Sequence, residues 1–406
     1  MQTTKPWLSI VGVGEDGWNG LSKAAQQAVE SADIIFGGAR HLAFLPKSSA
    51  VQVTWQSQIS QSIDELLAQH RGRSMVTVLA SGDPMLYGVG ALLTRRLNPS
   101  EYQVIPQVSA HSLACARLGW PIAETSLISL VNSPVETIVR YLFQGQRLVI
   151  YSRDGSTPGS VARLLVEYGY SRSQITVLER MGGPAERRQD GIASSWRSSD
   201  CADLNVIAVI CVADPGVRPL STVPGLPDDA FETDGQLTKR EVRAITLARL
   251  APLPGQTLWD VGAGTGTIGI EWMRTHVSCR CIAFEERPDR AQRITANAMH
   301  LGVPALQVAL GTAPSTFEGA PPPDAIFVGG GVATPKLLET CWDRLPSGGR
   351  LVANAVTVPG ETALASWQAT WGGELVRIAI SRALPIGGVL GWKPLSPITQ
   401  LVAIKS

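Results

Sequence analysis

One short stretch near the middle of the chain, residues 256–274, constrains the fold more than any other. It starts with an apolar run, Thr257-Leu-Trp-Asp-Val261, and breaks directly into Gly262-Ala263-Gly264-Thr265-Gly266. A segment with helical spacing follows, Ile268–Arg274. Glycines let the backbone turn tightly and approach a ligand closely, and the first turn of a helix presents free N–H groups. The stretch therefore predicts an α/β unit that binds a ligand at residues 262–266.

The next predicted strand supplies an acid. The run Cys279–Phe284 reads as a strand, and Glu285 follows it directly, about twenty residues past the glycine loop. An acid in this place can accept hydrogen bonds from both ribose hydroxyls of an adenosyl ligand. We prefer Glu285 over Glu286 because Glu285 is adjacent to the apolar run. After a third strand, 306–310, the turn with Gly311 and Ala313 is expected near the adenine.

The glycine loop alone does not separate enzyme classes, because nucleotide-binding dehydrogenases carry a similar one. The loop here lacks the G-x-G-x-x-G/A spacing, since Thr267 stands where dehydrogenases need a third small residue. The loop and the acid after the second strand together favour a class I, Rossmann-like methyltransferase.

A basic segment, Thr238-Lys-Arg-Glu-Val-Arg243, precedes the loop and predicts an amphipathic helix across the ligand site. Thr238 and Glu241 have the spacing of a capping box. Thr238 is also a candidate cofactor-binding residue. Lys239, Arg240 and Arg243 are suited to bind carboxylates of a substrate. A solvated helix face is the alternative interpretation of these three residues.

Strands alternate with helical segments in both halves of the chain, which indicates an α/β protein. A chain of 406 residues is long enough for two or three domains. The stretch 214–227 contains four prolines and two glycines and predicts a semi-rigid linker. We therefore expect one domain over residues 1–213 and a second over 228–406.

Charge and composition exclude some functions. The net charge is +1, which gives no global electrostatic case for nucleic acid or an anionic membrane. No targeting pattern opens the sequence and no run approaches the ~18 apolar residues of a membrane span, so we expect a cytoplasmic protein. Six scattered cysteines fit reduced thiols, and Cys279 and Cys281 lack a second pair of ligands for a metal site.

The first half has two turns of its own that suggest a ligand site. The predicted strand 8–14 ends in Gly12-Val-Gly14, and the predicted strand 75–80 ends in Ser81-Gly82-Asp83-Pro84. Open α/β sheets bind ligands at the carboxyl edge of their strands. The plain alternative is a capped turn with Asp83 as N-cap and Pro84 as the first helical residue.

These turns, with Phe36-Gly-Gly38, Tyr87-Gly88 and Ser109-Ala-His-Ser-Leu-Ala-Cys-Ala-Arg-Leu-Gly119, resemble the tetrapyrrole methylase family over residues 7–213. The charged, hairpin-like stretch 179–188 is also similar. The resemblance implies a two-lobed α/β domain with S-adenosylmethionine in a trough between the lobes. The matching positions are Gly12, Gly14, Ser81, Gly82, Asp83, Tyr87 and Ser109. Where the family has a His-Gly-Arg-Pro-like stretch, this chain has Val131-Asn132-Ser133-Pro134.

Residues 228–406 resemble the decarboxylating precorrin methyltransferase domain. The similar stretches are Thr238–Arg243, Leu258–Gly266, Phe327–Gly331, Val352–Thr357 and Pro385–Pro397. Two matches in this order resemble the fused precorrin-6Y methyltransferases of cobalamin biosynthesis. The resemblance implies methylation of ring carbon 5 by the first domain, and of carbon 15 with loss of carbon dioxide by the second. One S-adenosylmethionine per domain and a homo-oligomer are also implied.

The chemistry asks little of the side chains. A tetrapyrrole carbon attacks an activated methyl group, so placement in a dry cleft supplies much of the rate. Decarboxylation needs an apolar pocket around one carboxylate, for which Gly329, Gly330, Gly331, Asn354 and Thr357 are candidates. A methyltransferase for RNA or protein, and a chain with one non-catalytic scaffold domain, remain alternatives. The sequence leaves open whether the tetrapyrrole carries cobalt.

Overall fold

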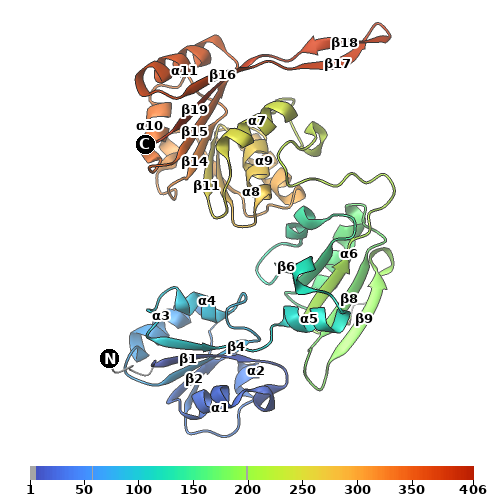
Figure 1. Ribbon diagram of the computed structural model, residues 1–406, viewed down its shortest axis with the longest axis vertical. Helices are drawn as coiled ribbons and strands as arrows, with labels where there is room; N and C mark the ends of the chain where they lie inside the picture. The colour runs from blue at the N-terminus through green and yellow to red at the C-terminus, as the bar shows by residue number, and fades with distance from the viewer. Residues whose placement is uncertain (1–5, 57, 198–199) are drawn as a thin grey trace. The chain divides into compact units, whose positions relative to one another are not determined.

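A computed structural model describes residues 6–56, 58–197 and 200–406. The chain forms two compact units (Figure 1). The first comprises Met1–Val135 and Phe143–Val217, and the second comprises Glu136–Leu142 and Arg218–Ser406. The division after Val217 lies inside the proline-rich stretch 214–227, and the short segment Glu136–Leu142 belongs to the second unit.

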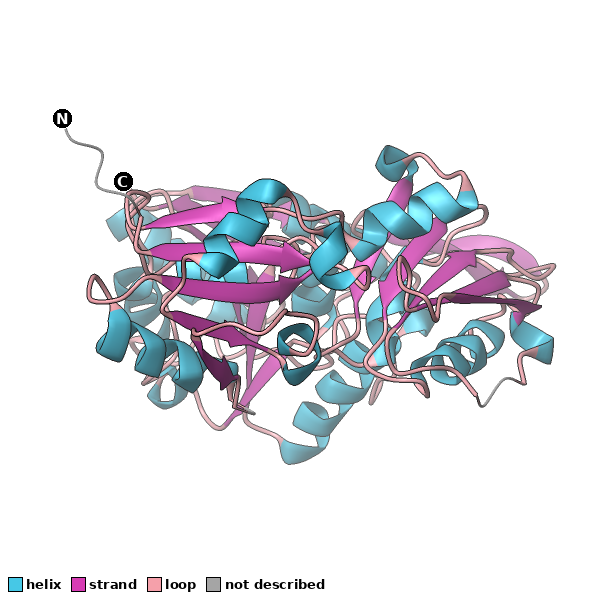
Figure 2. Ribbon diagram, turned by 90° about the horizontal axis from the view of Figure 1, so that it is seen from below, coloured by secondary structure: helices cyan, strands magenta, loops and turns pink. Residues whose placement is uncertain are grey.

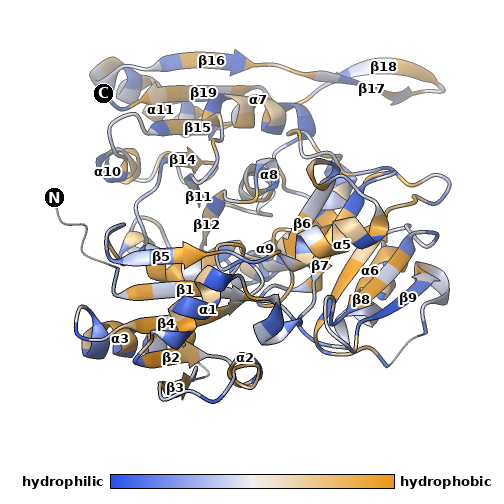
Figure 3. Ribbon diagram, turned by 60° about the horizontal axis from the view of Figure 1, so that its bottom comes forward, coloured by the Kyte–Doolittle hydropathy of each residue, from blue (hydrophilic) through white to orange (hydrophobic). Residues whose placement is uncertain are grey.

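The first unit contains two sheets. Its first sheet is entirely parallel and has the order β3-β2-β4-β1-β5. The strands are β1 (Leu8–Val13), β2 (Ile34–Gly37), β3 (Val51–Thr54), β4 (Val76–Ser81) and β5 (Tyr102–Ile105). The helices are α1 (Lys23–Glu30), α2 (Ala39–Leu42), α3 (Ile59–His70) and α4 (Val89–Thr94). The central strands β1 and β4 are buried almost throughout, as expected for a parallel sheet with helices on its faces. Figure 2 shows strands flanked by helices, and Figure 3 shows apolar residues along β1.

The second sheet of this unit is mixed, with the order β6-β7-β10-β8-β9. Only β6 and β7 run parallel. The strands are β6 (Thr125–Ser129), β7 (Arg147–Tyr151), β8 (Gln174–Glu179), β9 (Arg187–Ile192) and β10 (Asn205–Ile210), with helices α5 (Ala110–Leu118) and α6 (Thr157–Glu167). The charged stretch 179–188 is the β8–β9 hairpin, as the sequence predicts.

The second unit is built on a seven-stranded sheet of order β13-β12-β11-β14-β15-β19-β16. Six of these strands run in one direction, and β19, which lies between β15 and β16, runs antiparallel to both of its neighbours. The strands are β11 (Thr257–Val261), β12 (Arg280–Glu285), β13 (Gln307–Leu310), β14 (Ala325–Val328), β15 (Arg350–Ala355), β16 (Glu374–Ile378) and β19 (Ile398–Ile404). The helices are α7 (Arg240–Leu250), α8 (Thr267–Thr275), α9 (Pro288–His300), α10 (Leu337–Arg344) and α11 (Val358–Trp371). The core contains two buried clusters, and Trp259 and Trp272 are their largest fully buried side chains.

Parallel order reverses at β11, which lies between β12 and β14. The loops after these strands leave the same edge of the sheet, so the reversal opens a crevice there, where doubly wound proteins bind ligands. The two-part α/β architecture expected from the sequence is confirmed.

Two local predictions are wrong. The cap of α7 is Lys239 and has no side-chain hydrogen bond, so Thr238 and Glu241 do not form a capping box. Instead, the Glu241 carboxylate accepts hydrogen bonds from Arg382 at 2.6 and 3.2 Å. The apolar run 351–358 predicts one strand, but β15 ends at Ala355, because Thr357 caps α11 and Pro359 stands in its first turn.

A two-stranded hairpin, β17 (Ser381–Ile386) and β18 (Val389–Pro394), extends away from the sheet of the second unit (Figure 1). Apolar side chains on it are exposed, including Leu390 and Trp392. No helix among the described residues is long and apolar enough to span a membrane.

Candidate active sites

The glycine loop of the second unit follows β11 at the carboxyl edge of the sheet. Gly262, Gly264 and Gly266 all have a positive φ, at 67°, 62° and 77°. A Cβ atom on Gly262 would lie 2.8 Å from backbone atoms of Gly330. The structure thus brings two predicted glycine segments, 262–266 and 329–331, into backbone contact. Any residue with a side chain at position 262 would push the two segments apart.

Glu285 lies against this loop. It ends β12, is 4% exposed, and accepts hydrogen bonds from the N–H groups of Gly264 at 2.8 Å and Arg287 at 3.1 Å. Glu286, the neighbour we did not prefer, is exposed. The carbonyl of Glu285 accepts from the Gly311 N–H at 2.9 Å, which places the turn after β13 beside it. Ala313, two residues further, is partly buried against the core.

Helix α8 begins directly after the loop, and its N-cap residue Gly266 provides no side-chain hydrogen bond. Thr265, within the loop, is buried, and its carbonyl accepts from the Asn297 side chain at 3.1 Å. Ala263 is partly exposed and donates its N–H to the Phe284 carbonyl. These hydrogen bonds fix the loop to the residues packed beneath it. The dipole of α8 gives the start of that helix a partial positive charge.

Sequence reasoning missed Asp260, which lies beneath the loop. The side chain is 1% exposed, and Oδ2 accepts the Gly269 N–H at 2.9 Å. Its other oxygen, Oδ1, has no hydrogen-bond partner. Burial raises the pKa of Asp260 to about 7, the Gly269 hydrogen bond opposes the rise, and the nearby Glu285 adds to it. A carboxylate within an otherwise apolar strand was the signal that could have identified it.

The loops after β14 and β15 contain the other predicted pocket residues. Gly329 and Gly331 are exposed at the carboxyl edge. The Asn354 side chain turns inward, donating to Thr246 Oγ1 at 3.1 Å and accepting from Gln400 at 2.9 Å. Thr357 accepts the Gly360 N–H at 3.4 Å as the cap of α11. The glycines thus form an open wall, whereas Asn354 belongs to a buried network under α7.

The three basic residues of the α7 segment differ in their availability. Arg243 is fully buried and donates to the carboxylates of Glu271 at 2.5 Å and Asp228 at 3.2 Å. It also donates to the carbonyls of Thr238 and Leu226. Four of its five N–H groups are used in this way, so Arg243 is not available to a substrate carboxylate in this geometry. Lys239 and Arg240 have no side-chain hydrogen bond or ion pair within the described residues.

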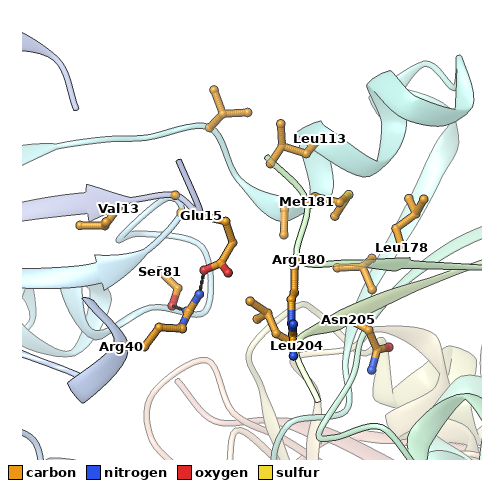
Figure 4. Close-up of a pocket in the computed structure, with 15 residues that line it drawn as sticks. Val13, Glu15, Arg40, Ser81, Leu113, Leu178, Arg180, Met181, Leu204 and Asn205 are labelled. Carbon is orange, nitrogen blue, oxygen red and sulfur yellow. Dashed lines mark hydrogen bonds and ion pairs between the residues drawn. The ribbon is translucent and has the colours of Figure 1, made fainter. Parts of the chain in front are cut away.

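The first unit has a separate cleft between its two sheets, with about 480 Å³ of space open to solvent (Figure 4). Gly14, Ser81 and Gly82 line it from the first sheet. A Cβ atom on Gly12 would lie 2.2 Å from the Gly82 carbonyl oxygen, so the ends of β1 and β4 can meet only through glycine.

The remaining predicted residues of the first unit surround this region. Ser81 Oγ contacts Arg40 Nη2 at 3.1 Å and His41 Nε2 at 3.0 Å. Asp83 accepts the Met85 N–H at 2.8 Å and so caps a turn, as in the plain alternative, but Pro84 does not start a helix, because α4 begins only at Val89. Tyr87 is exposed with a φ of 55°, and its ring lies 6.1 Å from that of Tyr151. Ser109 caps α5 and accepts the Ser112 N–H at 3.0 Å.

Both halves of the chain are similar to known proteins. The family model of tetrapyrrole (corrin/porphyrin) methylases matches residues 8–193, and the precorrin methyltransferase domain matches residues 229–405. A precorrin-6Y C(5,15)-methyltransferase [decarboxylating] from Sinorhizobium sp. is 45% identical over 97% of this chain and 95% of its own. One with the same name from Mycobacterium tuberculosis is 44% identical over 97% of this chain and 98% of its own.

Among solved structures, the C-terminal domain of precorrin-6Y C5,15-methyltransferase from Rhodobacter capsulatus is 42% identical. The match covers 46% of this chain and 100% of the Rhodobacter domain, with a TM-score of 0.44. The two relatives above are similar over nearly their whole length, in the same domain order. The chain therefore belongs to the family of decarboxylating precorrin-6Y C(5,15)-methyltransferases.

Proposed function

We propose that this chain methylates carbons 5 and 15 of precorrin-6Y, or of its cobalt form, and removes carbon dioxide from the ring C acetate, using S-adenosylmethionine. The observation that carries the proposal is the presence of two glycine-built sites of different design in one chain. Similarity to enzymes of this name over 97% of the chain supports it.

The residues at the glycine loop of the second unit suit an adenosyl sulfonium ligand. Gly262 and Gly264 leave room for close approach, and a Cβ atom on Gly262 would strike Gly330. The Glu285 carboxylate beside Gly264 is placed to accept ribose hydroxyls. The orphaned Oδ1 of Asp260 adds a buried acceptor below the loop. When bound, S-adenosylmethionine supplies an electrophilic methyl group.

The chain's own contribution to methyl transfer is then position and exclusion of water. The loop 262–266 and the wall 329–331 hold the reacting atoms in line, and no strong general base is needed for attack by an electron-rich carbon. Gly311 and Ala313 bound the site on the side of β13.

Decarboxylation needs a different environment, because a cation at the departing carboxylate would stabilise the ground state. We assign the glycine wall 329–331 and Thr357 to that carboxylate, and Lys239 and Arg240 to other acetate or propionate groups. Arg243 is left out because its guanidinium is occupied by protein acceptors. Asn354 is assigned to the buried network with Thr246 and Gln400 rather than to substrate contact.

The cleft of the first unit is assigned to methylation of carbon 5, with a second S-adenosylmethionine at Gly12, Gly14, Ser81, Gly82 and Ser109. Asp83 and Tyr87 are placed at its rim. We further propose that the chain is a cytoplasmic homo-oligomer without nucleic-acid partners, supported by its family and its net charge of +1.

The proposal is tested on the full chain with one disabling variant per unit. Gly12→Val blocks the first site, since even a Cβ atom would lie 2.2 Å from the Gly82 oxygen, and Gly262→Val blocks the second. Each is incubated with precorrin-6Y, or with its cobalt form, and S-adenosylmethionine, and products are identified by mass spectrometry.

We expect the unaltered chain to add two methyl groups and release one carbon dioxide. The Gly12→Val protein should add one methyl group and still release one carbon dioxide. The Gly262→Val protein should release no carbon dioxide. No reaction of the unaltered chain with either substrate would refute the tetrapyrrole assignment and leave an RNA or protein substrate. Binding of one S-adenosylhomocysteine per chain instead of two would indicate a scaffold unit.

A further inference from the structure

Three charged side chains line the cleft of the first unit: Glu15, Arg40 and Arg180. Two of them neutralise each other, since the Arg40 guanidinium forms an ion pair with the Glu15 carboxylate. In Figure 4 a dashed line joins this pair, whereas none reaches Arg180. The cleft therefore has one uncompensated positive charge, at Arg180.

The other polar groups around the cleft are occupied. The Asn205 amide accepts from Ser152 Oγ at 2.5 Å and donates to the Ala202 carbonyl at 2.8 Å. Ser81 Oγ is in contact with both Arg40 and His41. Within the described part of the chain, the Arg180 side chain has no hydrogen bond or ion pair. Arg180 thus provides free donors in a cleft whose other polar side chains already have partners.

The backbone holds Arg180 in a costly conformation. Its φ is 46°, in the left-handed region that non-glycine residues seldom adopt. Two hydrogen bonds fix this geometry: the Arg180 N–H donates to Leu204 O and the Gly183 N–H donates to Arg180 O, both at 3.1 Å. Strained residues of this kind are concentrated at ligand sites, where the surrounding structure maintains them. A glycine at position 180 would adopt this conformation without strain, as Gly182 does two residues later with a φ of 85°.

Neighbouring charges do not explain the position. Glu179, the adjacent residue, accepts two hydrogen bonds from Arg187, at 2.6 and 3.0 Å, and one from Gln189. Arg188, on the same hairpin, is paired with Asp190. Both other arginines of the hairpin thus have carboxylate partners, and Arg180 alone among the three lines the cleft.

We propose that Arg180 binds a carboxylate in the cleft of the first unit and so positions a reactant for methyl transfer there. A guanidinium binds a carboxylate through two parallel hydrogen bonds, which fixes orientation as well as charge. Both reactants of the proposed function supply this group: the amino-acid end of S-adenosylmethionine, and the acetate and propionate arms of the tetrapyrrole. The inference rests on the proposed function and identifies a binding residue for it.

The test uses the full chain with Arg180→Gln, Arg180→Lys and the matched control Arg188→Gln, which removes a paired arginine of the same hairpin outside the cleft. Binding of S-adenosylhomocysteine is measured by equilibrium dialysis, with decarboxylated S-adenosylmethionine as a competitor that lacks the carboxylate. The KM of the tetrapyrrole and kcat are measured for methylation at carbon 5, with carbon dioxide release as the signal of the second unit.

Loss of one bidentate contact is expected to weaken binding about 10- to 100-fold. If the cofactor supplies the carboxylate, Arg180→Gln weakens S-adenosylhomocysteine binding at one site and leaves the decarboxylated competitor unchanged. If the tetrapyrrole supplies it, cofactor binding is unchanged and the KM rises with kcat retained. Arg180→Lys should recover part of the loss, and carbon dioxide release should not change.

The proposal is overturned if Arg180→Gln matches Arg188→Gln in both measurements, or if Arg180→Lys is as impaired as Arg180→Gln. Failure of the unaltered chain to methylate at all would instead count against the proposed function.

Discussion

At the scale of single residues, the buried acid below the glycine loop makes the second unit sensitive to pH. Asp260 accepts one hydrogen bond, has one unpartnered oxygen, and has a pKa raised to about 7 chiefly by burial. The titratable groups facing it are Glu285 and Cys281. Because the folded chain holds this proton more tightly than the unfolded chain, ionisation of Asp260 opposes folding.

The first prediction follows from that sign. Below about pH 4 the acid is protonated in both states and contributes no penalty; the penalty grows as the pH rises towards 7 and is constant above it. Asp260→Asn removes the titration, so its stability relative to the unaltered chain should increase from pH 4 to 7 and then level off. Calorimetric unfolding of both proteins across this range measures the difference. A difference independent of pH would contradict the prediction.

The second prediction separates steric contact from backbone strain in the glycine loop. Gly262 and Gly264 have nearly the same φ, but only a Cβ atom on Gly262 meets the Gly330 backbone, at 2.8 Å. Alanine at either position costs ~1–2 kcal/mol for its left-handed conformation, and Gly262→Ala adds ~1–3 kcal/mol of overpacking. Gly262→Ala should therefore lower S-adenosylhomocysteine affinity more than Gly264→Ala, by isothermal titration of the full chain. Equal losses would show that the contact with Gly330 is unimportant.

At the scale of elements, a residue from far along the sequence caps α8, the helix that follows the glycine loop. Arg140 belongs to the short segment of the second unit, Glu136–Leu142, and is buried. It donates to the carbonyls of Met273 at 2.7 Å and Arg274 at 3.3 Å, in the last turn of α8. A cation at this end satisfies free carbonyls and complements the helix dipole.

The third prediction concerns this cap. Arg140→Met leaves two buried carbonyls without their donor and should destabilise α8 by about 1–3 kcal/mol. Arg280→Met is the matched control, because exposed Arg280 also donates to two carbonyls, both at 3.1 Å. Its effect should stay within about 0.5 kcal/mol. Hydrogen exchange of α8, followed by mass spectrometry, should be faster in Arg140→Met only; equal rates in both variants would contradict the proposed cap.

The elements show which predictions sequence alone could support. Strand, glycine turn and helix at 256–274 are set by neighbouring residues, and the structure has β11 and α8 there. The buried role of Arg243 could not be read locally, because its partners Asp228 and Glu271 lie 15 and 28 residues away. For the same reason Asn354 gave no sign that it pairs with Gln400, which lies 46 residues away. Helical spacing shows which side chains share one face of a helix, but it does not show which residues pack against that face.

At the scale of the whole molecule, the second unit extends beyond the boundary expected from composition. The sequence suggests a linker up to residue 227, yet Leu226 is 2% exposed and belongs to the core of the second unit. The buried Glu271 carboxylate accepts the N–H groups of Gly225 at 2.6 Å and Leu226 at 3.0 Å. Arg274 donates to the Leu220 carbonyl at 2.8 Å. The proline-rich stretch is thus partly a structural component of the second unit.

The last prediction compares three fragments that share the same C-terminus and begin at residues 218, 223 and 228. The fragment 228–406 loses the buried Leu226 side chain and two backbone donors of Glu271, which keeps Arg243 as its partner. The cost is on the order of 3–5 kcal/mol. Against a typical stability of about 5–15 kcal/mol, this leaves a marginal fold. The fragment 223–406 keeps Gly225 and Leu226 but loses the Leu220 carbonyl, so its urea midpoint should lie between the other two. All three lack residues 136–142, so the comparison isolates the contribution of 218–227. Should 223–406 unfold at the midpoint of 228–406, the contacts of Glu271 would not be what stabilises this part of the unit.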